Sequence, residues 1–295
     1  MRTIPPRLKA LALVGALLVA GYSVVLLRLA RLAWSSDLYS YILLVPLVSG
    51  YLVWIRRADL LRPAEPSPAF GAAVGAMGVA LLLLDYHFGG GRSPDAVNSI
   101  ALETASLLLV GTSAGAWLLG AACLRRLLFP LAFLILVIPI PTFLVGRIQH
   151  LLQTGSAAVA YAFFRISGTP VYFSSLIFQL PGISIEVAPE CSGLRSTLAL
   201  FMTSLVAAHM LLRSNWRRTA LIIVVIPLAL LRNGFRVYVI GQLCVSIGPE
   251  MINSYIHRRG GPYFFLLSLV PLLAVLLVLM KSERSVRPMH AAEIQ

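Results

Sequence analysis

Long runs of apolar residues, separated by short clusters of polar and basic residues, set the pattern of this chain. Eight of these runs approach the roughly 20 apolar residues that a helix needs to cross a bilayer. We therefore predict an all-α polytopic membrane protein with about eight transmembrane helices in a single membrane domain, residues 1–295. The expected spans are 10–27, 38–55, 69–84, 100–122, 127–146, 194–212, 219–247 and 261–280.

The pattern changes in the longest connection, residues 147–190, which precedes the sixth expected span. Residues 148–166 are apolar with polar interruptions, a pattern typical of a helix that lies in the membrane interface. Two segments rich in β-branched and aromatic residues, 171–180 and 183–187, flank Pro181-Gly182, so we expect a short β-hairpin. We predict that this insertion lies on the outer face of the membrane and leads the chain to Cys191.

The composition excludes an ordinary soluble protein, because 59% of the residues are hydrophobic and 12% are charged, against about a quarter charged in average soluble domains. The net charge of +13 is carried by short basic clusters between apolar runs, so we predict no nucleic-acid partner and interpret the clusters as a topology signal. With both termini in the cytoplasm, fourteen of the 24 Lys and Arg residues fall inside and seven outside. The first apolar run has no small-residue cleavage site before a soluble region, so we expect a retained span rather than a signal peptide.

The chain has three cysteines, too few for a disulfide framework, and no Cys/His spacing typical of a zinc site. We predict neither a metal nor a cofactor. Cys123 and Cys244 lie within apolar runs, as packed structural cysteines do. Cys191 differs, because it lies between Glu190 and Ser192 at the expected start of a helix, with Arg195 four residues further on. The alternative is an ordinary loop-to-helix junction in which Ser192 is the N-cap.

The seventh expected span contains Arg232, Asn233 and Arg236. A charge within a span is costly, so such a residue is a candidate functional residue that faces the protein interior. Arginine is a poor base but stabilises an oxyanion, a thiolate or a carboxylate well. The alternative is snorkelling to the outer interface, which would require a break near Asn233-Gly234 to bring Arg236 close to a helix end.

His257, just before the last expected span, is a candidate general base, although a single loop histidine is often an ordinary interfacial residue. The topology places Cys191, Arg236 and His257 at the outer side of the membrane. A nucleophile, a base and a charge-stabilising group form an acyl-transfer set. For Glu103, an unusual carboxylate in the fourth span, we expect packing or a partner arginine and assign no role.

The sequence resembles the exosortase/archaeosortase family of multi-spanning protein-sorting enzymes. The resemblance rests on Glu190-Cys191-Ser192-Gly193-Leu194-Arg195, on Arg232-Asn233-Gly234-Phe235-Arg236, and on His257 with Gly260 and Gly261. A further likeness lies in residues 37–49, where Tyr41 replaces a histidine that many members have, a departure that suggests a different subtype. The resemblance covers roughly residues 37–267.

The resemblance implies a cysteine transpeptidase of the bacterial inner membrane, with cytoplasmic termini and an active site facing the periplasm. Its substrates would be tail-anchored proteins with a short C-terminal Pro-Glu-Pro-like motif, one transmembrane helix and a basic tail. It would cleave the sorting signal through a thioester and pass the product to an acceptor in surface or exopolysaccharide assembly, with hydrolysis as the other outcome. The implied catalytic residues are Cys191, Arg236 and His257, supported by Arg195, Arg232, Asn233, Glu190 and Ser192.

Two non-enzymatic alternatives remain at the level of sequence. In a transporter or flippase component, Arg232 and Arg236 would bind an anionic lipid-linked saccharide within the membrane. In a scaffold subunit of a polysaccharide export complex, changes at Cys191 and His257 would have no effect. Membrane lipids are expected partners in every case, and the oligomeric state stays open.

Overall fold

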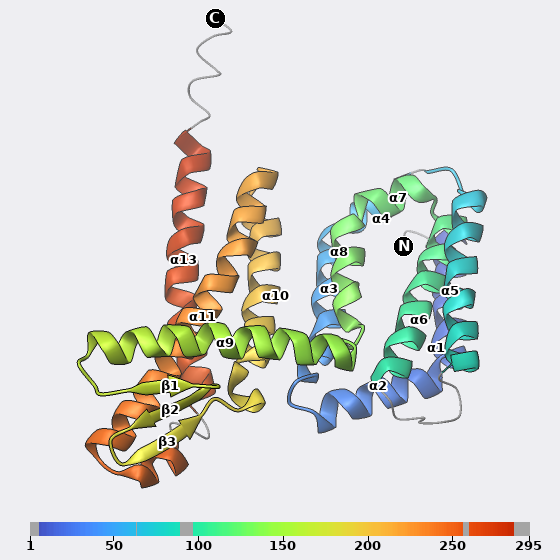
Figure 1. Cartoon of the computed structure of the whole chain (residues 1–295). Helices are drawn as coiled ribbons and strands as arrows, with labels where there is room; N and C mark the ends of the chain where they lie inside the picture. Colours follow the sequence, from blue (N-terminus) through green and yellow to red (C-terminus); the bar gives the residue numbers. More distant parts are fainter. Residues whose placement is uncertain (1–5, 63, 89–96, 256–259, 286–295) are drawn as a thin grey trace, which may run out of the picture. The chain divides into compact units, whose positions relative to one another are not determined.

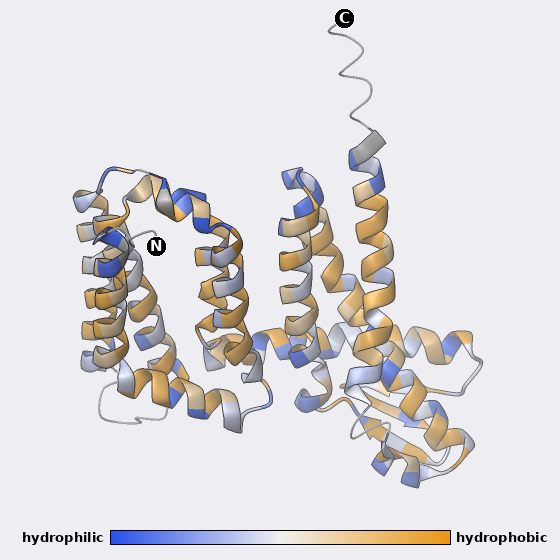
Figure 2. Cartoon of the chain, turned by 180° about the vertical axis from the view of Figure 1, so that it is seen from behind, coloured by the Kyte–Doolittle hydropathy of each residue, from blue (hydrophilic) through white to orange (hydrophobic). Residues whose placement is uncertain are grey.

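The computed structural model describes residues 6–62, 64–88, 97–255 and 260–285. Its contacts group the chain into two compact units, Met1–Val145 and Gly146–Gln295, and each is described by itself (Figure 1). In both units hydrophobic residues line the lengths of the helices, and hydrophilic residues gather at many of their ends (Figure 2). The structure therefore confirms a mostly helical, polytopic membrane protein.

The first unit is entirely helical in its described part. Its elements are α1 (Pro6–Gly21), α2 (Ser23–Ser35), η1 (Ser40–Leu43), α3 (Leu44–Ile55), α4 (Arg57–Leu61), α5 (Pro68–Phe88), α6 (Val97–Leu118), α7 (Ala121–Arg126), α8 (Leu128–Phe133) and η2 (Leu134–Val137).

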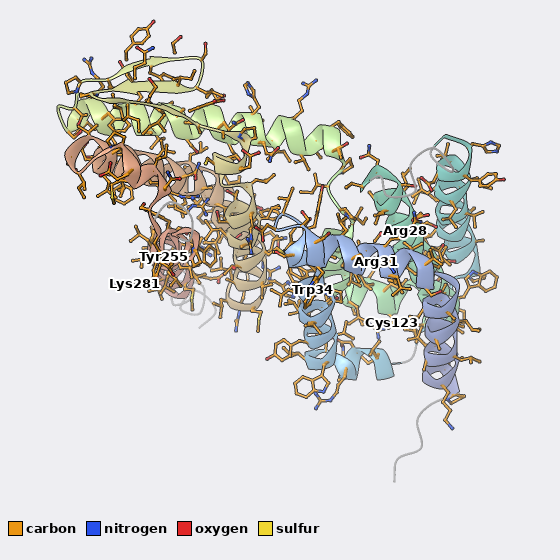
Figure 3. All side chains as sticks on the ribbon, turned by 90° about the horizontal axis from the view of Figure 1, so that it is seen from below. Arg28, Arg31, Trp34, Cys123, Tyr255 and Lys281 are labelled. Atoms are coloured by element: carbon orange, nitrogen blue, oxygen red, sulfur yellow. The ribbon has the colours of Figure 1, made fainter. Side chains whose placement is uncertain are left out.

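The first expected span is not one straight helix, because α1 and α2 meet at Tyr22 with a bend of 71°. α2 buries Val25, Leu29 and Ala33 on one side. Arg28, Arg31 and Trp34 lie along the same helix (Figure 3), and Trp34 is 87% exposed. Arg28 and Arg31, two of the seven basic residues expected on the outer side, are therefore helical residues.

Close packing of α5 against α6 forms the centre of the first unit. The Ser106 hydroxyl donates to the carbonyl oxygen of Gly78 at 2.8 Å, and that of Ser113 donates to Gly71 at 2.7 Å. Small residues allow helix backbones to approach closely in a bilayer, where polar side chains also bond across helices. Beside this contact, Arg28 forms an ion pair with Glu103, which gives Glu103 the partner arginine that we expected.

The fifth expected span, 127–146, is wrong as a continuous helix. The chain forms α8 and η2 and then leaves helical geometry at Ile138, before α9 begins at Thr142. Pro139 and Pro141 lie in this break, and proline lacks the N–H of the helix ladder and disfavours helical geometry in the residue before it. The expected interfacial helix 148–166 is consequently longer, because α9 occupies Thr142–Ile166.

The second unit combines long helices with a small sheet. After α9 come β1 (Tyr172–Ser174), β2 (Ile177–Leu180), β3 (Ile183–Glu186), η3 (Pro189–Ser192), α10 (Leu194–Leu211), α11 (Asn215–Ser246), η4 (Pro249–Asn253) and α13 (Gly261–Ser285).

The sheet has three antiparallel strands in the order β1-β2-β3, not the two strands of the expected hairpin. A turn at Ser175 and Leu176, both with positive φ, divides the expected first strand into β1 and β2. Neither residue type signals such a turn, which glycine or asparagine usually forms, so the pattern did not reveal it. The expected turn at Pro181-Gly182 does connect β2 to β3.

The core of the second unit joins the sheet to α9 and α11. Phe178, Ile185 and Val187 from the sheet segment pack with Phe164 of α9 and Ile240 of α11 in one buried cluster. A second cluster joins α10, α11 and α13, where Leu200, Leu221 and Leu272 are all nearly inaccessible. The sheet is thus packed against α9 and α11.

Among the described residues, fewer helices than the eight expected spans are long and apolar enough to cross a membrane. Within the described residues, five helices are long and apolar enough to cross a membrane, or up to seven if each of two bent pairs counts as one span. The second expected span is short, because η1 and α3 together cover only Ser40–Ile55. The five are Pro68–His87, Val97–Leu119, Pro189–Leu211, Asn215–Ser246 and Gly261–Glu283.

Candidate active site

Cys191 lies in the short 3-10 turn η3 that connects the sheet segment to α10. Its backbone N–H donates to the carbonyl oxygen of Ala188 at 2.9 Å, which closes the turn that Pro189 begins. The thiol is half-buried, whereas Cys123 and Cys244 are buried. Of the three cysteines, Cys191 is therefore the accessible one.

Gly193 separates the turn from α10 and changes the expected geometry. It has φ +75° and forms the N-cap position of α10, so Ser192 is not the N-cap residue. The Ser192 hydroxyl accepts a hydrogen bond of 3.4 Å from the N–H of Leu194 instead. Because a left-handed residue lies between Cys191 and Arg195, the four-residue spacing of this pair does not place both side chains on one face of a continuous helix.

Two successive side chains of α11 hold the Cys191 turn by its main-chain carbonyl groups. Asn233 donates from Nδ2 to the carbonyl oxygen of Cys191 at 2.8 Å. Arg232 donates from Nη2 to the carbonyl oxygen of Gly193 at 3.2 Å and lies 3.5 Å from Oγ1 of Thr197. Arg232 and Asn233 are 7% and 2% exposed, so these bonds form away from solvent.

The same contacts explain why position 193 is glycine. A Cβ atom at Gly193 would lie 2.9 Å from Nη2 of Arg232 and 2.9 Å from Cγ of Asn233. Positive φ also disfavours any residue with a side chain. The close approach of α11 and the positive φ both require a residue without a Cβ atom at this position.

A pocket opens beside the thiol, between the end of β3 and one face of α11. The α11 side is formed by residues spaced at helical intervals, and the other side by consecutive residues of the strand. Its lining residues are Ile185, Glu186, Val187, Cys191, Asn233, Arg236, Val237 and Ile240. Cys191 and Arg236, expected to act together, therefore border one pocket.

Gln153 of α9 holds the end of the strand that leads to the site. The sequence had suggested no role for this residue. It is 6% exposed, and its Nε2 donates to the carbonyl oxygen of Val187 at 2.8 Å. Its signal in the sequence was a polar side chain within an otherwise apolar helical segment. Thr197, which accepts from Arg232, was likewise not singled out.

α11 runs without interruption from Asn215 to Ser246, with no break at Asn233-Gly234. Arg236 is ten residues from its C-terminal end, about 15 Å along the axis at 1.5 Å per residue. The unbroken helix therefore favours an interior role for Arg236 over the snorkelling alternative. At Gly234 a Cβ would lie 2.6 Å from Cβ of Val159, so α9 packs directly on this part of α11.

The remaining expected site residues have different positions. Glu190 and Arg195 are exposed, and neither lines the pocket. His257 lies outside the described residues. The segment around Tyr41 belongs to the first unit, in η1. Among the described residues, no group of three His, Cys, Asp or Glu side chains is arranged to hold a metal ion.

Residues 33–274, more than four-fifths of the chain, match the family model of the transmembrane exosortases. The chain belongs to the transmembrane exosortase family, which confirms the resemblance found in the sequence. Membership supports a membrane transpeptidase-type role in general. No curated protein and no solved structure matches the chain.

Proposed function

We propose that the chain is a membrane-embedded cysteine transpeptidase or protease that cleaves the C-terminal sorting signal of exported proteins. The observation that carries the proposal is the shared pocket of Cys191 and Arg236, with the Cys191 turn held by Asn233. A nucleophile fixed through its own backbone, beside a permanent cation, suits attack on a carbonyl group whose oxygen becomes negative.

In the proposed reaction, the sulfur of Cys191 attacks the scissile carbonyl carbon after His257 has taken the thiol proton. A C–S bond forms, and the carbonyl oxygen becomes an oxyanion to which Arg236 donates hydrogen bonds. When the oxyanion collapses, the C–N bond breaks and His257 protonates the leaving amine, which leaves a thioester. A nucleophile of the acceptor then attacks the thioester, the C–S bond breaks, and the sulfur regains a proton.

The proposed substrates carry a short C-terminal motif, one transmembrane helix and a basic tail. The proposed location is the bacterial inner membrane, with both termini in the cytoplasm and Cys191 at the periplasmic side. The distribution of basic residues along the chain supports this orientation.

The transporter alternative receives less support from the contacts of Arg232. Its Nη2 group bonds to Gly193 and lies beside Thr197, so part of this guanidinium serves the protein's own backbone rather than a bound saccharide. Arg236 borders a pocket that also contains a thiol, which saccharide binding does not require.

The proposal is tested by co-expressing Cys191→Ala with a reporter protein fused to the C-terminal tail of an exported protein encoded in the same genome. We refer to this fusion as the tail reporter. Processing should stop, while the variant should accumulate in the membrane at the wild-type level. Cys123→Ala, which removes a buried thiol of the first unit, is the matched control and should process normally. Normal processing by Cys191→Ala would overturn the proposal.

A further inference from the structure

β3 has one paired edge and one free edge within the described residues. It pairs with β2 in an antiparallel register that matches Phe178 with Ile185 and Leu180 with Ile183. No other strand follows β3 in the sheet. An unpaired strand edge presents N–H and C=O groups that can bond to another extended chain.

The hydrogen-bond alternation identifies which residues of β3 face the free edge. The N–H of Val187, just after the strand, donates to the carbonyl oxygen of Leu176 at 2.9 Å. In an antiparallel pair every second residue bonds to the same neighbour, so Ile183 and Ile185 also direct their N–H groups at β2. Ser184 and Glu186 therefore direct their N–H and C=O groups away from β2. Within the described part of the chain, no backbone hydrogen bond occupies this side of β3.

The pocket lies along this same free edge. Ile185, Glu186 and Val187 are consecutive, and their side chains alternate between the two faces, with Ile185 and Val187 buried and Glu186 exposed. A pocket on one face of a strand would contact every second residue. A pocket that contacts three in a row borders the strand edge, and β2 already occupies the other edge.

The free edge ends close to the nucleophile. Only four residues separate Glu186 from Cys191, and Cys191 borders the pocket together with Arg236 on the opposite wall. The pocket wall contributed by Ile185, Val187, Val237 and Ile240 is apolar. An extended backbone lying along β3 would thus pass Arg236 and Cys191, with an apolar side chain entering the pocket.

We propose that β3 binds the substrate by strand addition, so that the peptide segment next to the cleaved bond becomes a fourth strand of the sheet. This inference rests on the proposed function, because it takes the occupant to be the substrate. Main-chain hydrogen bonds to Ser184 and Glu186 hold the peptide in an extended form, and the pocket selects one side chain. Strand addition tolerates many sequences on the alternate positions, so recognition concentrates on the residue in the pocket.

The first test removes one outward N–H group of β3. In Ser184→Pro the ring replaces the N–H that faces the free edge, whereas pairing with β2 does not use that group. The matched control is Ser184→Ala, which keeps the N–H and removes only the hydroxyl. We expect Ser184→Pro to process the tail reporter at least about tenfold more slowly than Ser184→Ala, which keeps the outward N–H. Equal processing by both variants would overturn strand addition.

A folding control accompanies this test, because Ser184→Pro could disturb the sheet. Reaction of Cys191 with a membrane-impermeant maleimide reports whether the pocket is still formed. Wild-type labelling together with slow processing supports the inference. If Ser184→Pro loses labelling as well, Glu186→Pro and Glu186→Gln replace the pair, because Glu186 presents the other outward N–H group.

The second test detects the added strand directly. In a Cys191→Ala chain that also carries Ser184→Cys, single cysteines are placed at successive positions around the cleavage site of the tail reporter. Because side chains of paired strands alternate between faces, disulfides with position 184 should form best at the reporter residue directly opposite, more weakly at the residues two positions before and after it, and not at the intervening positions. Cross-linking at all positions, at none, or between two copies of the enzyme would overturn the inference.

The two proposals fail in different ways. If Cys191→Ala processes the tail reporter normally, the proposed catalytic function is wrong. If Cys191→Ala is inactive but Ser184→Pro works normally and no alternating cross-links form, only strand addition is wrong.

Discussion

Asn233 and Cys191 lie 42 positions apart in the chain, and a hydrogen bond of 2.8 Å joins the amide of one to the backbone carbonyl of the other. The contact leaves the thiol itself uninvolved. Arg232, the preceding residue, reaches the carbonyl of Gly193 in the same way. Two neighbouring side chains of α11 therefore determine the path of the Cys191 turn.

Replacement of Asn233 should slow the reaction without removing the protein from the membrane. Asn233→Ala leaves a carbonyl without its donor, which costs on the order of 1–1.5 kcal/mol and predicts processing about tenfold slower. Asn233→Asp should be slower still, because a carboxylate oxygen repels the carbonyl oxygen of Cys191. Processing of the tail reporter measures both effects. The control is Gln242→Leu, which removes a polar side chain further along α11 that accepts a hydrogen bond from Thr169. An equal defect there would contradict a specific role for Asn233.

Gly193→Ala should be more damaging than alanine at another glycine with the same backbone conformation. Gly168 has φ +74°, close to the +75° of Gly193, but a Cβ there would meet nothing within 4 Å. Gly168→Ala therefore carries only the cost of the left-handed conformation, about 1 kcal/mol. Gly193→Ala adds contacts of 2.9 Å with Arg232 and Asn233 and should abolish most processing. Similar activities of the two variants would show that the close approach of α11 is unimportant.

Thiol labelling should single out Cys191. Cys123 and Cys244 are 1% and 3% exposed, whereas Cys191 is half-buried and borders a pocket. A membrane-impermeant maleimide added to spheroplasts should modify one site, and Cys191→Ala should eliminate the label. Labelling that persists in that variant would contradict the burial pattern, and labelling only in inverted vesicles would reverse the proposed orientation.

The Arg28–Glu103 ion pair predicts non-additive stability effects in the first unit. Both side chains are largely buried, at 19% and 14% exposed. Glu103→Leu or Arg28→Met alone leaves a charge without its partner and should lower the unfolding free energy by roughly 3 kcal/mol. The double variant should recover most of that loss, because it leaves no unpaired charge. Thermal unfolding in detergent measures the stability of the two single variants and the double variant. If the two single losses of stability simply add in the double variant, the residues are not coupled.

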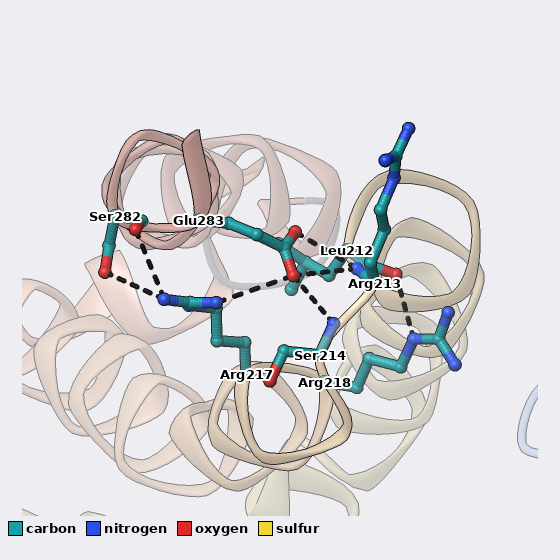
Figure 4. A network of polar contacts seen from close by, with 7 residues as sticks. All are labelled: Leu212, Arg213, Ser214, Arg217, Arg218, Ser282 and Glu283. Carbon is teal, nitrogen blue, oxygen red and sulfur yellow. Dashed lines mark hydrogen bonds and ion pairs between the residues drawn. The ribbon is translucent and has the colours of Figure 1, made fainter. Parts of the chain in front are cut away.

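Glu283 joins the end of α13 to the start of α11, and its removal should loosen that junction. Its carboxylate accepts from the N–H of Ser214 at 2.7 Å and lies 3.5 Å from Nη1 of Arg217, which also bonds to Ser282 (Figure 4). We expect Glu283→Ala to lower the unfolding temperature in detergent more than Glu283→Gln, because glutamine keeps an oxygen acceptor. Lys281→Ala, an exposed position on the same helix, is the control and should have little effect. An equal shift for alanine and glutamine would assign the effect to the charge alone.

The sequence predicted the helical membrane fold well where apolar runs were long and uninterrupted. α6, α11 and α13 lie within a few residues of the expected spans. The errors fall where local geometry overrides hydrophobicity. Prolines 139 and 141 break the fifth span, and Gly21 and Ser23 flank the bend at Tyr22, a weaker signal that the hydrophobic pattern does not reveal. A hydrophobic run predicts that a segment is buried in lipid, but it does not predict where the helix bends or breaks.

The candidate site was predicted as a set of residue types rather than as an arrangement. Cys191 and Arg236 do border one pocket, as their shared side of the membrane suggested. The roles of Asn233 and Arg232 could not be derived, because they depend on which α11 face approaches residues 191–193. The turn at Ser175 and Leu176, which creates the third strand, also depends on tertiary packing rather than on turn-forming residues.

The support of the Cys191 turn through carbonyl groups has a consequence for the chemistry of position 191. The hydrogen bonds from Asn233 and Arg232 to this turn, and the bond from Cys191 to Ala188, use main-chain atoms of residues 191 and 193 and not the Cys191 side chain. The backbone at position 191 is thus held in place independently of the side chain that it carries. Serine or selenocysteine at this position should occupy the same place as the native thiol, so differences in their rates would report nucleophilicity and leaving-group strength alone.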